Sequence, residues 1–293
     1  MGSNDLALKA HLLRRAGFGA SRGELEEIAK NGYEEIVEDL IHPERFEDLD
    51  EDYIRRYNPE LSYHDGFQNH AGRWIWRMIN TKRPLEEKMA LFWHHVFATA
   101  YYKSEHVPTL IAQIETFRNN GLSNIKKVLN DLAKDPAMNY WLDNCENHSD
   151  QPNENWGREL LELFSMGVGN YSEDDIKNAS RAFTGWTFEQ PHPLYPFGHF
   201  ASSFIFDEDD HDGSEKTFLG KTGNFNGEDI VEIICEQPAT AKFICRHLYT
   251  FFVEDEPQVH TWSIEEPRNP EAIDEMIKVF METDGDIRSI LRF

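Results

Sequence analysis

The sequence has few basic residues and few cysteines, and it has no long hydrophobic run. Only 29 Lys and Arg stand against 53 Asp and Glu in 293 residues, which gives a formal net charge of −24. Such an acidic surface disfavours nucleic acid and anionic membranes as partners. No run approaches the roughly 18 apolar residues of a membrane-spanning helix, so no membrane span is predicted.

Catalytic signature motifs are also absent. The GxSxG, HExxH and GxGxxG patterns do not occur, and these mark serine hydrolases, zinc peptidases and dinucleotide-binding sites. Cys145, Cys235 and Cys245 have no CxxC spacing, which argues against a zinc ribbon or a thiol redox motif. The N-terminus has no apolar stretch followed by a small-residue cleavage site, so no signal peptide is predicted in this chain.

What the chain does have is helical periodicity over most of its length. With 40% hydrophobic and 13% aromatic residues, it is expected to fold around a real core. We predict a mainly α protein, in which residues 1–293 form one multi-helix orthogonal bundle. Residues 187–226 are rich in proline, aromatic and acidic residues and form a long irregular insertion. A short β-hairpin is expected there, between 204–206 and 217–219.

Three local patterns give sharper predictions. Ser21 and Glu24 have the spacing of a capping box, which starts a helix. Residues 85–100 are apolar on nearly all sides, so this helix is expected to be the buried centre of the core. Residues 44–64 contain little apolar sequence and are expected to be an irregular surface connection.

The stretch from Trp141 to Trp186 holds most of the chemically useful polar groups. Pro152-Asn153 is predicted to start a helix with Asn153 as its N-cap. Asn155, Glu159 and Glu162 then share one face, with Arg158 beside them. Two carboxylates and an amide on one stripe suit a hard metal, a polar cofactor or acid–base chemistry. The alternative is a solvated ladder of salt bridges.

Two further groups are candidate contributors to a site. His94 lies on the predicted core helix, and His211-Asp212 closes an acidic turn in the insertion. Asp143 and Asn144 could line an oxygen-rich pocket with Asn153, Glu154 and Asn155, at the start of the helix. A structural role in the core or in a solvated turn is the alternative for each.

The order of motifs resembles one known family. The segments on which this resemblance rests are HLLRRAGFGAS (11–21), EKMALFWHHVFAT (87–99), DPAMNYWLDN (135–144), NENWGRELLELFSMGVGNYSEDDIKNASRAFTGW (153–186), HDGSEKTFLGKTGNFNGEDI (211–230) and ATAKFICRHLYTFFV (239–253). This pattern is similar to that of the bacterial domain of unknown function 1800 family, over nearly the whole chain. Some members have a second histidine where this chain has Val96.

The resemblance implies an α-helical protein, often exported to the periplasm or cell surface, and often encoded beside a sulfatase-like family that would be its protein partner. Members usually run longer, so further C-terminal helices are expected after Phe293. The resemblance brings no established reaction.

Two interpretations stay open. In the first, the protein has a hydrolytic or oxidative site that binds a divalent transition metal or a cofactor. Its catalytic residues are His94, Arg158, Glu159 and His211, its metal ligands His94, Glu159, Glu162 and His211, and its cofactor-binding residues Asp143, Asn144, Asn153, Glu154, Asn155 and Asp212. In the second, the protein is a non-catalytic structural or partner-binding module. The polar motif is then a buried network of salt bridges and hydrogen bonds.

Overall fold

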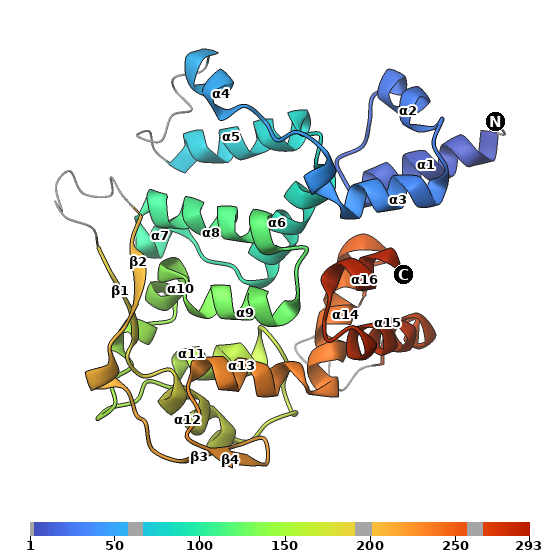
Figure 1. Ribbon diagram of the computed structural model, residues 1–293. Helices are drawn as coiled ribbons and strands as arrows, with labels where there is room; N and C mark the ends of the chain where they lie inside the picture. The colour runs from blue at the N-terminus through green and yellow to red at the C-terminus, as the bar shows by residue number, and fades with distance from the viewer. Residues whose placement is uncertain (1–2, 58–66, 191–200, 257–265) are drawn as a thin grey trace.

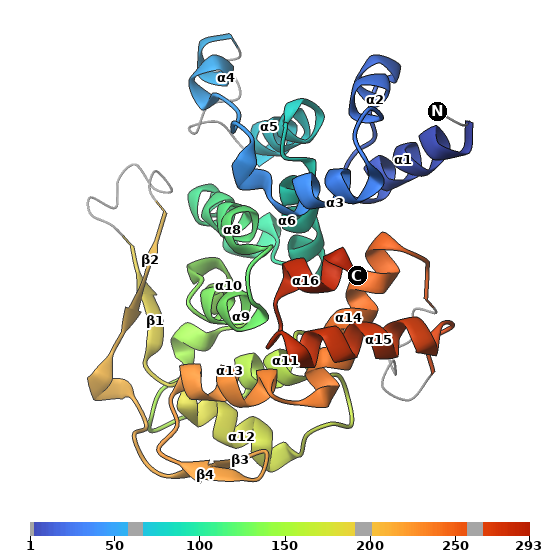
Figure 2. The ribbon, with the colours of Figure 1, turned by 45° about the vertical axis from the view of Figure 1, so that its right-hand side comes forward.

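A computed structural model describes residues 3–57, 67–190, 201–256 and 266–293 of the chain. These residues form sixteen α-helices and two small antiparallel sheets (Figures 1 and 2). The predicted mainly α fold is confirmed. Among the described residues, no helix is both long enough and apolar enough to cross a membrane.

The N-terminal part surrounds one buried helix. Its helices are α1 (Ser3–Arg15), α2 (Arg22–Ile28), α3 (Tyr33–Ile41), α4 (Glu51–Tyr57), α5 (Phe67–Asn80), α6 (Pro84–Val96), α7 (Tyr101–Ser104) and α8 (Val107–Asn120). Helix α6 packs against α3, α5 and α8. Its residues Leu85, Met89, Phe92 and Trp93 are at most 3% exposed, which confirms that this is a core helix. It ends at Val96 rather than near Ala100, because the next helix is the separate α7.

The middle of the chain carries the polar motif and the strands. Its elements are α9 (Ile125–Ala133), α10 (Pro136–Trp141), α11 (Asn155–Glu162), α12 (Glu173–Ala182), β1 (Trp186–Glu189), β2 (Ser203–Phe206), β3 (Lys216–Phe218) and β4 (Lys221–Gly223). Figures 1 and 2 both show the β1–β2 arm beside α10 and the β3–β4 hairpin beside α12.

The C-terminal helices return to the start of the chain. They are α13 (Gly227–Cys235), α14 (Pro238–Phe252), α15 (Pro270–Glu282) and α16 (Ile287–Arg292). Helix α16 packs on α3, where Arg292 pairs with Glu38, and Arg288 pairs with Glu44 in the 3₁₀ turn that follows α3. One cluster of buried apolar side chains extends from Leu13 to Ile290.

The expected pairing of the strands is wrong. Residues 204–206 pair with β1, with Trp186 opposite Phe206, and β3 pairs with β4 instead. Leu219 and Gly220 have φ angles of 46° and 80°, and two such residues form the tight turn that joins neighbouring strands. The β3–β4 hairpin is therefore closed locally, and this leaves β2 for β1.

Gly185 allows the β1–β2 arm to start. It has a φ of 76°, and its carbonyl accepts a hydrogen bond of 2.8 Å from the Asp207 amide. A Cβ atom at this position would overlap the Asp207 carbonyl oxygen. Glycine is therefore required by both the backbone angle and the close approach.

Other local predictions have mixed outcomes. The Ser21–Glu24 capping box is confirmed. The 44–64 segment is not wholly irregular, because it contains a short 3₁₀ turn and α4; its residues 58–64 lie outside the described part. Helix α11 begins one residue later than predicted, with Glu154 at the N-cap, although the Asn153 side chain still accepts a hydrogen bond from the Asn155 amide.

Two leucines at the end of α11 test this packing. Leu160 lies in the helix and is 0% exposed, and Leu163 is its C-cap residue and is 53% exposed. We expect Leu160→Ala to lower the free energy of unfolding by about 2–5 kcal/mol, through lost apolar burial and a residual cavity. Leu163→Ala is the matched control and should change it by less than about 0.5 kcal/mol. Urea unfolding measures both; equal losses would contradict the packing described.

Candidate functional site

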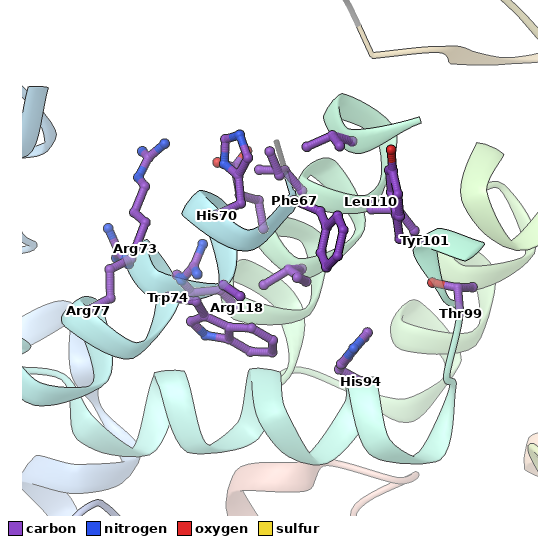
Figure 3. A pocket seen from close by; sticks show the side chains of 15 residues that line it. Phe67, His70, Arg73, Trp74, Arg77, His94, Thr99, Tyr101, Leu110 and Arg118 are labelled. Carbon is purple, nitrogen blue, oxygen red and sulfur yellow. The ribbon is translucent and has the colours of Figure 1, made fainter. Parts of the chain in front are cut away.

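A cavity of about 240 Å³ lies between α5, α6 and α8 (Figure 3). Its walls are mainly aromatic and aliphatic, from Phe67, Trp74, Tyr101 and the α8 residues Leu110 and Ile111. Phe67 stacks on Tyr101 with 4.5 Å between the ring centroids. Concave apolar cavities with a few polar groups are the usual form of small-molecule sites.

A buried carboxylate holds the three helices together at one end of this cavity. Glu87 of α6 is 0% exposed. Its Oε1 accepts hydrogen bonds of 2.7 Å from the Nε atoms of Arg77 on α5 and Arg118 on α8. Its Oε2 accepts one of 2.9 Å from the Trp74 indole. A buried charge needs such pairing, because an unpaired one costs several kcal/mol.

Arg118 presents donors to the cavity. Its Nε is held by Glu87, while within the described part of the chain its terminal nitrogens make no hydrogen bond. Arg118 lines the cavity, and its side chain is 11% exposed. The guanidinium is therefore fixed at one nitrogen, with its other N–H groups available to a bound molecule.

His94 supplies the second polar group of the cavity. Figure 3 shows its ring directed from α6 into the cavity. The ring makes an edge contact with Trp74 at 5.6 Å, and its Nδ1 is buried with no hydrogen-bond partner among the described residues. Burial, with a smaller effect from His95, lowers the pKa of His94. The imidazole is therefore neutral at neutral pH.

A hydrogen-bonded chain supports the wall near α7. The Thr99 hydroxyl donates to Gln113 Oε1 at 2.6 Å, and Gln113 Nε2 donates to Asp135 Oδ1 at 2.7 Å. Asp135 also caps α10 through the Met138 amide, at 2.8 Å. All three side chains are buried, and burial raises the pKa of Asp135 to about 7.

The predicted cofactor-binding asparagines form a ladder elsewhere in the molecule. Asn144 Nδ2 donates to Asn139 Oδ1, and Asn147 Nδ2 donates to Asn144 Oδ1, at 3.1 Å each. The backbone amide of Asn153 then donates to Asn147 Oδ1, and the backbone amide of Asn155 donates to Asn153 Oδ1. We name Asn139, Asn144, Asn147, Asn153 and Asn155 the asparagine ladder.

The ladder also holds neighbouring elements. Asn144 donates to the Trp186 carbonyl, Asn147 to the Ser180 carbonyl and Asn155 to the Leu142 carbonyl, at 2.8–3.0 Å. It therefore joins α10, α11, α12 and β1 by bonds that satisfy its amides internally. Of the two other oxygen groups predicted there, Asp143 pairs with Lys103 at 2.9 Å and Glu154 pairs with Arg158.

The charged residues of α11 lie on a partly exposed face. Arg158 pairs with Glu154 and with Glu173. Burial, followed by the charge of Glu162, raises the pKa of Glu159. Glu162 Oε2 accepts a hydrogen bond of 3.1 Å from the Tyr171 hydroxyl.

His211 and Asp212 are held by the end of α12 and by Thr184, which follows it. His211 Nδ1 lies 2.9 Å from the Thr184 carbonyl, and Arg181 Nε donates to Asp212 Oδ2 at 2.7 Å. Burial alone would raise the pKa of Asp212. The hydrogen bonds and charge of Arg181 and the hydrogen bonds of Ser214 have a larger, opposite effect, so the pKa of Asp212 is well below the usual range. This turn is fixed by internal bonds.

Comparison with known proteins assigns the family. The sequence profile of the family described as "Protein of unknown function (DUF1800)" matches residues 11–293. The chain belongs to this family. Searches of curated proteins and of solved structures each found no match. Because the family is described as one of unknown function, membership does not assign a reaction to this DUF1800 protein.

The four predicted metal ligands do not share one centre. Nowhere in the ranges that the structure describes do three His, Cys, Asp or Glu side chains form a group able to hold a metal ion. The structure brings Glu159 and Glu162 together, places His94 at the α5–α6–α8 cavity and places His211 against Thr184. Metal binding by these four residues stays a prediction.

Sequence reasoning found one cavity residue, His94, and missed Arg118 and Thr99, as well as Glu87, which lies outside the lining. Glu87 and Thr99 are the two ends of the 87–99 segment, but Arg118 comes from α8, and no short motif joins it to them. One available signal was the charged run of residues 86–88 at the start of a helix expected to be apolar on nearly all sides, of which Glu87 is fully buried.

The asparagine ladder gives a stability prediction. Asn147→Ala removes a donor to the Ser180 carbonyl and an acceptor of the Asn153 amide. We expect a loss of about 1–3 kcal/mol of unfolding free energy for each buried group left unpaired. Asn170→Ala is the control, because Asn170 is exposed, and it should cost about 1 kcal/mol or less. Similar losses in both variants by urea unfolding would contradict a structural ladder.

Asp135 gives a pH prediction. Its pKa is about 7 in the folded chain and roughly 3.9 when unfolded. Between these values unfolding releases this proton, so the contribution of Asp135 to stability falls as pH rises, by on the order of 4 kcal/mol in total. Asp135→Asn should remove this loss, so its unfolding free energy relative to wild type should increase from pH 4 to pH 8. Urea unfolding across that range measures it; parallel curves would count against a neutral buried Asp135.

Proposed function

We propose that the α5–α6–α8 cavity binds a small organic carboxylate with an apolar body. The observation that carries the proposal is the Arg118 guanidinium, fixed by buried Glu87 and open to the cavity at its terminal nitrogens. Planar guanidinium groups pair with carboxylates through two parallel hydrogen bonds. The apolar walls would cover the rest of such a molecule.

The charges of the lining agree with an acidic ligand. Arg73, Arg77 and Arg118 line the cavity with Glu115 as the only acidic residue among the lining side chains described. Glu87 and Asp48 accept hydrogen bonds from this arginine cluster from outside the lining. In a chain with a net charge of −24, a cavity whose lining has three arginines and one glutamate is a local exception.

His94 extends the chemistry of the site beyond binding. A neutral imidazole offers one donor and one acceptor, so it can hydrogen-bond the ligand on either side of a proton transfer. Its buried Nδ1 has no partner within the described residues. His94 is the residue that we propose as the proton acceptor in any reaction at this cavity.

A structural role is proposed for the polar motif of residues 153–162. The asparagine ladder and the Arg158 ion pairs with Glu154 and Glu173 support it, because their hydrogen-bonding groups bind other protein groups. The motif would then fix the packing of α10, α11 and α12, rather than hold a cofactor.

Ligand-induced stabilisation tests the binding proposal. Phenylalkanoates with one to three methylene groups are compared with their matched primary alcohols. A ligand at 100 times its Kd adds roughly 2.7 kcal/mol to the unfolding free energy, so the best acid should raise the Tm by several degrees. The alcohols should give little shift, since they cannot pair with the guanidinium.

Two variant pairs locate the effect. A charge-assisted hydrogen bond contributes roughly 1.5–3 kcal/mol, so Arg118→Gln should weaken acid binding about tenfold or more. His94→Gln should weaken it too. The matched controls are Arg22→Gln and His95→Gln, since Arg22 and His95 are exposed. Equal shifts by acids and alcohols, or unchanged binding in Arg118→Gln, would refute the proposal.

A further inference from the structure

We infer that the ligand of the α5–α6–α8 cavity carries a hydroxyl or N–H donor at the end remote from its carboxylate, and that Thr99 recognises this donor. This inference rests on the proposed function and narrows its ligand class to hydroxy-substituted or amino-substituted acids. The argument starts from the direction of three hydrogen bonds.

The hydrogen bonds behind Thr99 have a fixed direction. The Met138 amide can only donate, and it donates to Asp135 Oδ1. That oxygen is therefore an acceptor, and the Gln113 amide meets it with Nε2, at 2.7 Å. Gln113 is 1% exposed. Because its Nε2 faces Asp135, its Oε1 faces Thr99 and accepts a hydrogen bond from the Thr99 hydroxyl.

This direction decides what Thr99 can offer to a ligand. A threonine hydroxyl has one proton and two lone pairs. Its proton is used on Gln113 Oε1, at 2.6 Å. Thr99 lines the cavity, so its oxygen can only accept a hydrogen bond from a bound molecule.

The position of Thr99 allows it to bind the end of the ligand that is remote from the carboxylate. Figure 3 shows Arg118 beside Trp74 and Thr99 on the opposite side of His94. The guanidinium supplies donors at one end, and Thr99 supplies an acceptor at the other. A molecule held by its carboxylate at Arg118 would bring its remote substituent towards Thr99, across the apolar walls.

The experiment compares ligands that differ only at the remote end. Three series of phenylalkanoates are titrated by calorimetry: unsubstituted, para-hydroxyl and para-methoxy. The hydroxyl compound can donate to Thr99, and the methoxy compound can only accept. In the wild-type protein the hydroxyl acid should bind roughly threefold to tenfold more tightly than the other two, as expected for a neutral hydrogen bond.

Variants assign this preference to Thr99. Thr99→Ser keeps the hydroxyl and should keep the preference. Thr99→Val removes the acceptor and should abolish it, so that the three acids bind with equal affinity. Gln113→Met frees the Thr99 proton, so the methoxy acid should then gain affinity relative to the hydroxyl acid. The last variant covers the case in which Thr99→Val does not fold.

The outcomes separate this inference from the proposed function. Binding of all three acids with equal affinity, or a preference that survives Thr99→Val, overturns the role of Thr99 and leaves carboxylate binding intact. An unchanged preference for the hydroxyl acid over the methoxy acid in Gln113→Met also overturns it. Failure of every acid to bind the wild-type protein overturns the proposed function itself.

Discussion

The cavity depends on the buried carboxylate of Glu87. This side chain has no exposure to solvent, and it receives donors from Trp74, Arg77 and Arg118. These donors come from α5 and α8, so one group on α6 sets the spacing of three helices. Removing a partner from such a pair costs about 3–5 kcal/mol, because a buried charge is left uncompensated. Glu87 also fixes Arg118, so the same carboxylate holds the helices together and positions the proposed binding group.

Two sets of polar residues in this DUF1800 protein have different properties. The asparagine ladder and the Asp212–Arg181 pair are bonded to other protein groups and join elements across α10–α12. His94 Nδ1 and the terminal nitrogens of Arg118 make no hydrogen bond within the described ranges, and both residues line a cavity. A group satisfied by the protein stabilises it, whereas a group left open in a cavity is available to a ligand.

How much could be predicted from the sequence depends on the range of the interaction. The Ser21 capping box and the burial of α6 follow from local chemistry and periodicity, and both are confirmed. The pairing of β2 with β1 was missed, because the turn at Leu219-Gly220 pairs β3 with β4 and leaves β2 for β1. His94 was identified as a candidate, but Arg118 and Thr99, which line the same cavity, were not. Thr99 follows His94 closely in the chain, but Arg118 reaches the cavity only when α5, α6 and α8 pack together.

The most direct test of the account is nuclear magnetic resonance of the protein with ¹⁵N-labelled histidine, assigned with His94→Gln. At neutral pH the His94 ring should be neutral, since burial lowers its pKa. Titration with 3-phenylpropanoate should shift the His94 nitrogens in a saturable way, leave exposed His148 unchanged, and lose this effect in Arg118→Gln. A charged His94 at neutral pH, or an acid that binds without shifting it, would contradict the α5–α6–α8 cavity as the functional site.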